Sequence, residues 1–311
     1  MLRLASVKWL RAILTLLICV TIVFFVLRIS GDPAQALLPD DTPAEILAEY
    51  RRRWGLDLPL WEQYLRYLAA VVRGDFGISF ADGRPAWEVV MEKIPNTLLL
   101  GGLSLAVAIA SGLVAGVTAA RHHGRRLDRF VMGFAVLGYS LPNFFLAIML
   151  ILVFALQMRL LPSAGSQTWA HLVMPVLTLS AATAGKVARF TRTSMLEVLG
   201  LPFVRAVRGK GVPPVAVLMR HAIPNAAIPI VTMLGFELGL VIGGAVVTET
   251  VFAWPGVGRL LVVSVGQRDL AVVQTIILLI AATMVASNLL VDIAYGWLDP
   301  RVNASRVQKE A

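Results

Sequence analysis

Six apolar stretches, each long enough to cross a lipid bilayer, constrain this chain more than any other feature of its sequence. A transmembrane helix needs about 20 apolar residues to cross roughly 30 Å of hydrocarbon. The stretches run from Trp9 to Leu27, Leu98 to Thr118, Phe130 to Leu156, Ala170 to Phe190, Ala226 to Thr248 and Ala271 to Gly296. Because a backbone in lipid has to satisfy its hydrogen bonds within its own segment, all six are predicted to be helices. The predicted fold class is therefore an all-α integral membrane protein with six transmembrane helices.

The composition supports this class, because 58% of the residues are hydrophobic and only 15% are charged, against about 25% charged residues in soluble domains. A cleaved signal peptide is an alternative interpretation of the first stretch, because the chain begins with the basic residues Arg3, Lys8 and Arg11. Its apolar region is, however, longer than the roughly 7 to 15 residues of a signal peptide. The single cysteine, Cys19, lies within this stretch and is expected to be an inert packing residue.

The distribution of charge predicts the topology. Seventeen of the 28 Lys and Arg residues, with four acidic residues, fall in the two terminal segments and in the second and fourth connections between the stretches. Residues 31–95 carry seven basic and eleven acidic residues. Since basic residues favour the cytoplasmic side, both termini are predicted to be cytoplasmic and residues 31–95 extracytoplasmic. The formal net charge of +9 then reflects topology, and no nucleic-acid partner is expected.

This topology divides the chain into four parts. Residues 1–30 form a tail and the first helix, and residues 31–95 form an extracytoplasmic loop with short helices. Residues 96–297 form a five-helix core that includes a cytoplasmic segment at 198–224, and residues 298–311 form a cytoplasmic tail.

The extracytoplasmic loop has local order of its own. Thr42-Pro43-Ala44-Glu45 combines an N-cap, a first-turn proline and a capping-box glutamate, which predicts a helix through about Arg53. The loop also holds seven aromatic residues, which are expected to contact membrane lipid at the interface or a partner protein. They are Trp54, Trp61, Tyr64, Tyr67, Phe76, Phe80 and Trp87.

The sequence contains no recognisable catalytic motif. Its two Gly-Lys pairs, at 185–186 and 209–210, lack the spacing of a phosphate-binding loop, so the chain is not expected to hydrolyse ATP. The histidines show no metal-ligand spacing, so no metal site is expected, and no serine lies in a nucleophile-elbow pattern. These histidines are His122, His123, His171 and His221. The sequence therefore favours a path across the membrane over an enzyme.

A basic, proline-rich segment, FVRAVRGKGVPPVAVLMRHAIPNAAIP, occupies residues 203–229 on the predicted cytoplasmic side. Residues 203–211 contain no helix breaker other than glycine, Pro213-Pro214 impose a change of direction, and Val215 to Ala222 can form a second short helix. These patterns alone leave two interpretations open. The segment is either an ordinary basic loop or a rigid element that receives a displacement from a separate ATPase.

The spacing in this segment resembles the cytoplasmic signature of ATP-binding cassette (ABC) importer permeases, in which E-A-A is followed by three residues, a glycine, nine residues and I-x-L-P. Arg205-Ala206-Val207, Gly211 and His221-Ala222-Ile223-Pro224 occupy these positions, and the glutamate is absent, as in the peptide branch of the family.

Eight stretches in order resemble the dipeptide, oligopeptide and nickel permease family and cover essentially the whole chain. They are GDPA (31–34), RRRWGLDLPLWEQYLRYL (51–68), GDFGISF (74–80), PNTLLL (95–100), GKG (209–211), RHAIPNAAIPIVT (220–232), GGAVVTETVFAWPGVGRLL (243–261) and NLLVDIAYGWLDPR (288–301).

The resemblance implies a type I importer fold in the bacterial cytoplasmic (inner) membrane. It implies pairing with a second, homologous permease, docking onto two ABC subunits that use ATP and Mg, and delivery of substrate by an extracytoplasmic binding protein. This chain itself is expected to bind no cofactor. By the resemblance, the ATPase-coupling residues are Phe203, Arg205, Ala206, Arg208, Gly209, Lys210 and Gly211. Peptides are the implied cargo, with nickel chelates, glutathione or another small solute as alternatives.

Glu237 lies at the centre of the fifth apolar stretch, eleven residues from each end. A carboxylate there costs about 2.5 to 3.5 kcal/mol on insertion scales, so it is expected to face a cavity or a partner. One hypothesis is that it lines the translocation path and favours cationic groups such as a peptide amino terminus. The other is a hydrogen bond to the partner permease. Small residues suited to close helix contact lie roughly opposite, at Gly235, Gly239, Gly243 and Gly244.

Several other residues of the core have predicted structural roles. Gly112-x-x-x-Gly116 predicts a second helix-packing seam, and Pro142 and Pro175 are expected to kink their helices. Asp292 is expected to make a structural pair. The short apolar stretch 260–265 is a candidate re-entrant element beside an outer gate. The candidate gate residues are Glu249, Trp254, Pro255, Gly256 and Gly258.

Two functions of other classes remain as alternatives. A secondary transporter would show inverted repeats and several charges within the membrane, and neither is found here. A purely structural membrane subunit would not explain the signature in residues 203–229.

Overall fold

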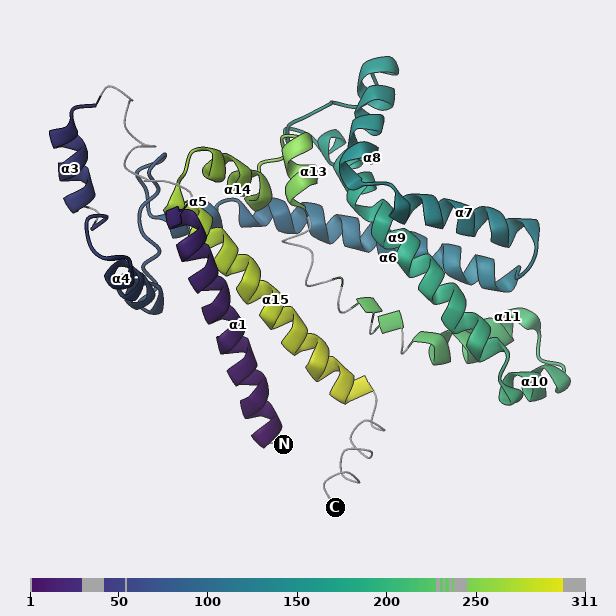
Figure 1. Cartoon of the computed structure of the whole chain (residues 1–311). Helices are drawn as coiled ribbons and strands as arrows, with labels where there is room; N and C mark the ends of the chain where they lie inside the picture. Colours follow the sequence, from purple (N-terminus) through teal and green to yellow (C-terminus); the bar gives the residue numbers. More distant parts are fainter. Residues whose placement is uncertain are drawn as a thin grey trace. The chain divides into compact units, whose positions relative to one another are not determined.

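The computed structural model describes residues 2–29, 42–53, 55–227 and 245–298, together with residues 230, 231, 233, 234 and 237. In these ranges the chain is helical apart from its turns and one isolated bridge between Ile78 and Pro85 (Figure 1). The elements are α1 (Leu2–Ile29), α3 (Ala44–Arg53), α4 (Leu60–Val72), α5 (Ala86–Met91), α6 (Ile94–Arg121), α7 (Arg126–Ser140), α8 (Asn143–Leu150), η1 (Ile151–Gln157), α9 (Ala170–Leu199), α10 (Pro202–Gly209), α11 (Pro214–Val217), η2 (Leu218–Ala222), α13 (Val246–Val251), α14 (Val257–Gly266) and α15 (Leu270–Leu298). The helix expected from the capping box at Thr42 is α3.

Four described helices are long and apolar enough to span a membrane, and they match the first, second, fourth and sixth apolar stretches. They run through Leu10–Ile29, Ala86–Arg121, Ala170–Leu199 and Leu270–Leu290. Most of the fifth stretch, with its glycine ridge at 235–244, lies outside the described residues. The structure therefore describes four spans, or five if the third stretch counts as one broken span.

The third apolar stretch is not one continuous helix, which corrects the expectation of a single run from Phe130 to Leu156. Helix α7 ends at Ser140, and the chain resumes as α8 and η1 at an angle of 105°. Pro142 explains the break, because its ring and missing N–H oppose a helix, and it forces Leu141 into an extended conformation (φ −78°, ψ 129°). Helix α9, by contrast, continues through Pro175.

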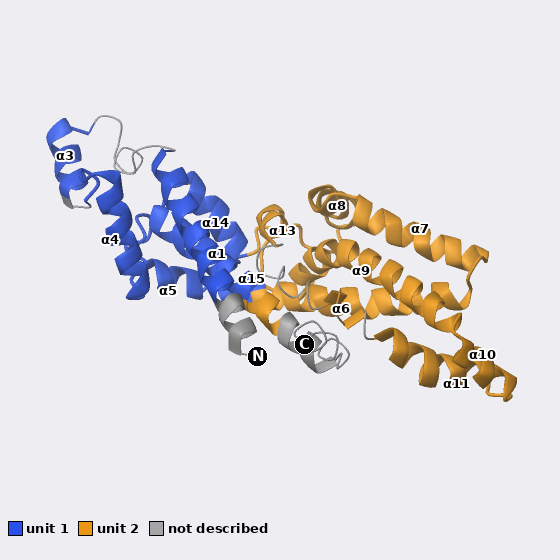
Figure 2. Ribbon diagram, turned by 60° about the horizontal axis from the view of Figure 1, so that its bottom comes forward, with its two compact units in different colours: residues 1–97, 255–285 blue, residues 98–254, 286–311 orange. Residues whose placement is uncertain are grey.

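The chain divides into two compact units (Figure 2). Unit 1 comprises residues 1–97 and 255–285, and unit 2 comprises residues 98–254 and 286–311. The core of unit 1 is an aliphatic cluster contributed by α5, α14 and α15, namely Ala86, Val89, Val90, Val257, Val272 and Ile276. A core cluster of unit 2 joins the end of α9 to α10, α11 and η2.

The glycines at 112 and 116 form the predicted seam, and α9 is the helix that packs against it. A Cβ added at Gly112 would lie 2.6 Å from Val187, and one at Gly116 would lie 2.6 Å from Thr191. On the neighbouring helix α7, a Cβ at Gly138 would lie 2.7 Å from the Ala181 carbonyl oxygen. Small residues thus bring both α6 and α7 into backbone-level contact with α9.

In unit 1, a buried aspartate fixes the start of α15. Ser79 Oγ donates to Asp269 Oδ2 over 2.5 Å, and the Val272 amide donates to Asp269 Oδ1 over 3.3 Å. Both side chains are buried, at 2% and 1% exposure. Asp269 therefore acts both as a helix N-cap and as the anchor of a loop 190 residues away in sequence.

Replacing Asp269 with alanine is expected to destabilise the protein by roughly 2 to 3 kcal/mol, because the helix loses its cap and the buried Ser79 hydroxyl loses its acceptor. The measurement is the midpoint of thermal unfolding in detergent. Asp82→Ala is the matched control, since Asp82 is exposed and its pair with Arg84 (3.4 Å) lies at the surface. Equal losses in the two variants would contradict the anchoring role.

Candidate functional site

The segment 198–224 forms a helix, a turn and a second helical piece, as its sequence predicts. Helix α10 begins with Pro202 at its first turn, which suits a residue without an N–H. Val204 is fully buried in a cluster with Met195 and Val198 of α9 and with Val217. Arg205 and Arg208, on the same helix, are exposed.

Gly211 makes the turn between the two helical pieces. Its φ of +80° lies in the left-handed region that favours glycine, and its amide donates to the Arg208 carbonyl over 3.0 Å. Pro213 and Pro214 then start α11, which continues as η2 to Ala222. All of the predicted coupling residues lie on the surface of this unit, namely Phe203, Arg205, Ala206, Arg208, Gly209, Lys210 and Gly211. The segment thus presents a basic surface, and its buried side packs in a hydrophobic core.

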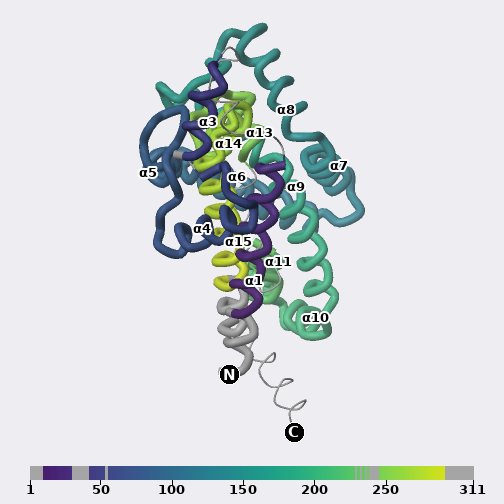
Figure 3. The backbone as a smooth tube through the Cα atoms, turned by 60° about the vertical axis from the view of Figure 1, so that its left-hand side comes forward, coloured from purple at the N-terminus to yellow at the C-terminus, as the bar shows by residue number. Residues whose placement is uncertain are grey.

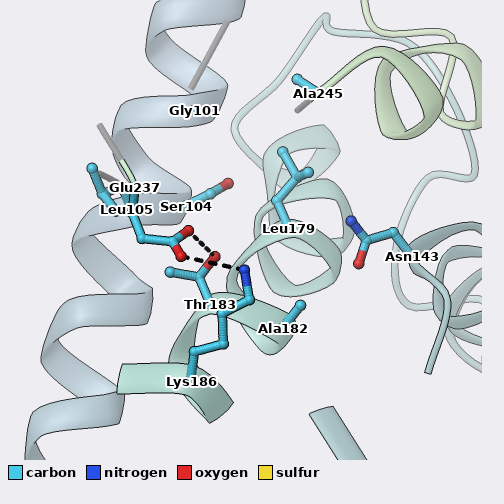
Figure 4. A pocket seen from close by; sticks show the side chains of 10 residues that line it. All are labelled: Gly101, Ser104, Leu105, Asn143, Leu179, Ala182, Thr183, Lys186, Glu237 and Ala245. Carbon is cyan, nitrogen blue, oxygen red and sulfur yellow. Dashed lines mark hydrogen bonds and ion pairs between the residues drawn. The ribbon is translucent and has the colours of Figure 1, made fainter. Parts of the chain in front are cut away.

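Glu237 forms an ion pair within its own chain (Figure 4). Lys186 Nζ lies 3.2 Å from Glu237 Oε1, and the Thr183 hydroxyl donates to Glu237 Oε2 over 3.2 Å. The Glu237 side chain is 13% exposed and that of Lys186 is 47% exposed. Because Thr183 and Lys186 are three residues apart on α9, they share one helix face and reach the carboxylate together.

These three side chains border a cavity of about 170 Å³ in unit 2. Helix α6 contributes one wall, α9 contributes another, and Asn143 stands at the first residue of α8, directly after the break at Pro142. The remaining lining residues are Gly101, Ser104, Leu105, Leu179, Ala182 and Ala245. Irregular backbone within a membrane is tolerated where it borders protein or a cavity, and the break in the third stretch meets this condition.

The sequence did not identify Thr183 and Lys186 as partners of Glu237. In the sequence, Lys186 stood out only as part of a Gly-Lys pair without the spacing of a phosphate-binding loop. A signal was nevertheless present, because a carboxylate at the centre of one span requires compensation and Lys186 is a cation within another.

The candidate gate residues fall in both units. In unit 2, Glu249 and Trp254 are buried, at 0% and 3% exposure, and the Trp254 amide donates to the Glu249 carbonyl over 2.8 Å. In unit 1, Asn96 Nδ2 donates to the Pro255 carbonyl over 3.0 Å, and the Val257 amide donates to Thr97 Oγ1 over 2.8 Å.

These contacts join two of the family-like stretches, because Asn96 and Thr97 belong to PNTLLL and fix the turn at Gly256. Gly258 follows in the first turn of α14. The apolar stretch 260–265 follows within α14, a helix of 10 residues. No part of the described structure tests a gating role for these residues. Asp292 lies in α15, in a stretch whose side chains are not described.

Comparison with known proteins places the chain in a family. The sequence profile described as "Binding-protein-dependent transport system inner membrane component" matches residues 112–304, and the corresponding N-terminal profile matches residues 1–101. The glutathione transport system permease protein GsiC of Escherichia coli strain K12 is 41% identical over 289 residues, covering 93% of this chain and 94% of that protein. GsiC of Shigella dysenteriae serotype 1 matches to the same extent.

A solved structure has a similar fold. The crystal structure of an amino acid ABC transporter with histidines covers 66% of this chain and 92% of its own, with a TM-score of 0.54 and 15% identity. The family comprises membrane permeases rather than catalytic enzymes, and its members are multi-pass proteins of the inner membrane. The chain belongs to the binding-protein-dependent transport system inner membrane components, and it is an ABC importer permease subunit similar to the dipeptide, oligopeptide and nickel permeases.

Proposed function

We propose that this subunit forms one half of a path through which a small peptide is imported, and that a second, homologous permease supplies the other half. The chain then has six spans in the type I importer arrangement, with both termini in the cytoplasm. Two ABC subunits supply energy from ATP and Mg, and an extracytoplasmic binding protein delivers the peptide. Relatives named for glutathione transport support this cargo, since glutathione is a tripeptide.

The Glu237–Lys186 pair in its cavity is the observation that carries the proposal. A peptide has both an ammonium group and a carboxylate. Its ammonium group can replace Lys186 as the partner of Glu237, while its carboxylate pairs with Lys186. Such an exchange leaves no charge unpaired in a region of low dielectric. The cavity of about 170 Å³ is smaller than the roughly 300 to 1,000 Å³ of a complete ligand pocket, which is consistent with a half-site.

Helix α9 provides a mechanical link between this cavity and the ATPase side. Thr183 and Lys186 lie in its middle, and its end packs on α10 through Met195 and Val198. The distance from Lys186 to Leu199 along a helix is about 20 Å. In this proposal, closure of the ATPase dimer moves α10, and continuous α9 transmits the movement to the pair. The gate role of Glu249, Trp254, Pro255, Gly256 and Gly258 stays part of the proposal.

Replacing Glu237 with glutamine is expected to reduce uptake of peptides with a free amino terminus roughly tenfold or more, because a charge-assisted hydrogen bond contributes about 1.5 to 3 kcal/mol. The measurement is uptake into vesicles that contain the assembled transporter and its binding protein. The substrates compared are glutathione, an unmodified dipeptide and the same dipeptide with an acetylated amino terminus. Uptake of the acetylated dipeptide, initially low, is expected to change little.

Ser104→Ala is the matched control, because Ser104 lines the same cavity but donates its hydroxyl to the Leu100 carbonyl of its own helix over 2.7 Å. An equal loss for every substrate in Glu237→Gln would show that the carboxylate is structural and would contradict its place in the path. Uptake of a nickel chelate in preference to all peptides would contradict the proposed cargo.

A further inference from the structure

The side-chain amide of Asn143 borders the cavity but takes no part in the exchange of charges proposed above. The polar side chains that line the cavity in the described part of the chain are those of Ser104, Asn143, Thr183, Lys186 and Glu237. Thr183 and Lys186 are hydrogen-bonded to Glu237, and Ser104 donates to a carbonyl of its own helix. Neither the oxygen nor the nitrogen of the Asn143 amide makes a hydrogen bond to a described residue. This amide is therefore free to bind a molecule in the cavity.

Asn143 lies where the third apolar stretch breaks. It is the midpoint of that stretch, thirteen residues from Phe130 and thirteen from Leu156. The tube view shows the chain changing direction here, between α7 and α8 (Figure 3). Glu237 has the same central place in the fifth stretch. Since a polar group without a partner is costly within a membrane, an amide at this position is expected to bind something.

The packing of α8 directs the Asn143 side chain toward α9. Ala147 lies four residues after Asn143, on the same face of α8. It is fully buried in a cluster with Met174 of α9. Figure 4 shows the Asn143 amide pointing toward the α9 residues of the lining. The amide thus faces the wall of the cavity to which Thr183 and Lys186 belong.

The charged pair alone cannot distinguish a peptide from a free amino acid. Both molecules carry an ammonium group and a carboxylate, so both can exchange with Glu237 and Lys186. A peptide differs in having an amide N–H between its charged ends. In an extended residue this N–H and the following carbonyl or carboxylate oxygen point to the same side. The side-chain amide of Asn143 offers the complementary acceptor and donor.

We propose that Asn143 binds the peptide bond of the cargo and makes the path selective for peptides over amino acids and esters. Its Oδ1 accepts a hydrogen bond from the peptide N–H, and its Nδ2 donates to the following carbonyl or carboxylate oxygen. The ammonium group and the carboxylate of the cargo pair with Glu237 and Lys186. This inference rests on the proposed function, because it takes the cavity to be part of a peptide path. It adds a determinant of specificity in the permease to the selection made by the binding protein.

The expected selectivity follows from the groups that are left unpaired. An ester analogue of a dipeptide has an oxygen atom in place of the N–H, which sets two hydrogen-bond acceptors against each other at Asn143 Oδ1. A site that bonds a substrate N–H discriminates strongly against an analogue that lacks it. Because Asn143 is half-buried rather than fully buried, the preference for the dipeptide is expected to be about tenfold.

The test compares uptake of alanylalanine with uptake of its ester analogue, using vesicles that contain the assembled transporter. Binding protein loaded with one compound or the other is supplied in equal amounts, so a change in the preference between variants belongs to the permease. The unaltered chain is expected to prefer the dipeptide. Asn143→Leu is expected to lower dipeptide uptake about tenfold and to change ester uptake less than about threefold. Asn143→Ala, which removes the amide without adding apolar bulk, is compared in the same way.

Two controls separate recognition from packing. Ser104→Ala alters the same cavity but removes a hydroxyl that donates to its own helix, so it is expected to keep the preference. Asn143→Gln retains an amide on a longer side chain and is expected to restore part of the preference, which a packing role does not predict. The concentration of loaded binding protein that gives half-maximal uptake is expected to be the same in Asn143→Leu, because the change affects the path and not the docking of that protein.

Three results would overturn the role of Asn143 while leaving the peptide path in place. An equal loss of dipeptide and ester uptake in Asn143→Leu would show that the amide is structural or contacts the partner permease. An unchanged preference in that variant would place the selection elsewhere, and a raised half-maximal concentration would indicate a role in docking. Uptake of neither compound by the unaltered chain would overturn the proposed cargo together with this inference.

Discussion

Replacing Gly185 with alanine is expected to disrupt unit 2, although a glycine-to-alanine change inside a helix ordinarily stabilises it by about 1 kcal/mol. A Cβ at Gly185 would overlap the carbonyl oxygen of Ala135 on α7 and would lie 3.3 Å from the Tyr139 ring. A backbone carbonyl cannot rotate away, so α7 and α9 would have to separate, at a cost of about 3 kcal/mol or more. The expected result is loss of most folded protein from the membrane, measured as the yield and unfolding temperature of the purified chain.

Gly133→Ala is the control for this change. Gly133 lies on α7, one of the same two helices, but a Cβ there would meet nothing within 4 Å. It is expected to leave the yield unchanged or to raise the unfolding temperature slightly. Similar behaviour of the two variants would mean that α7 and α9 do not pack as closely as described. The uptake of any Gly185→Ala protein that survives should also fall, because Thr183 and Lys186 flank this position.

Reversing the charges of Arg208 and Lys210 together, to glutamate, is expected to abolish import while leaving the chain inserted. Both side chains are exposed, whereas α10 packs on the core of unit 2 through Val204 and Val207. The substitutions therefore leave the core untouched and change only the surface that faces the ATPase in the proposed complex. Like charges brought against an acidic or carbonyl-lined groove would repel, so uptake is expected to fall more than about tenfold at an unchanged membrane level.

Arg220→Glu is the matched control for the coupling variant. Arg220 is an exposed basic residue of the same segment, residues 198–224, but it lies in η2 rather than on α10. If any positive charge on this segment served equally well for docking on the ATPase, Arg220→Glu would impair uptake as severely as the double variant. A role specific to α10 predicts that it retains most of the uptake.

Local patterns in the sequence were sufficient to predict several elements of the fold. The capping box predicts α3, the glycine pair at 112 and 116 predicts a close helix contact, and the Gly211 and Pro213-Pro214 pattern predicts the turn after α10. The capping box and the turn depend on the backbone preferences of a few neighbouring residues, and the glycine pair depends on the small size of two residues one turn apart. Such preferences act over one or two turns and are readable without knowledge of the tertiary fold.

Contacts between distant residues were not predictable in this way. Glu237 pairs with Lys186, 51 residues away in sequence. Arg192 forms a bidentate pair of hydrogen bonds, of 2.7 and 2.8 Å, with the carboxylate of the buried Asp128, 64 residues away. Nothing in the hydrophobic period specifies which polar residues of two helices face each other. The sharp break at Pro142 was predictable only in part. A proline predicts a kink or an end of the helix, but the angle between the two helices depends on what the second helix packs against.

The central claim is that energy from a separate ATPase enters this chain at α10. Its most direct test is ATP hydrolysis by the transporter reconstituted in vesicles, measured with and without binding protein loaded with substrate. The claim predicts that loaded binding protein stimulates hydrolysis with the unaltered chain but leaves it at the basal rate with Arg208→Glu/Lys210→Glu, although the variant is inserted at the same level. Equal stimulation in the two preparations would contradict the claim.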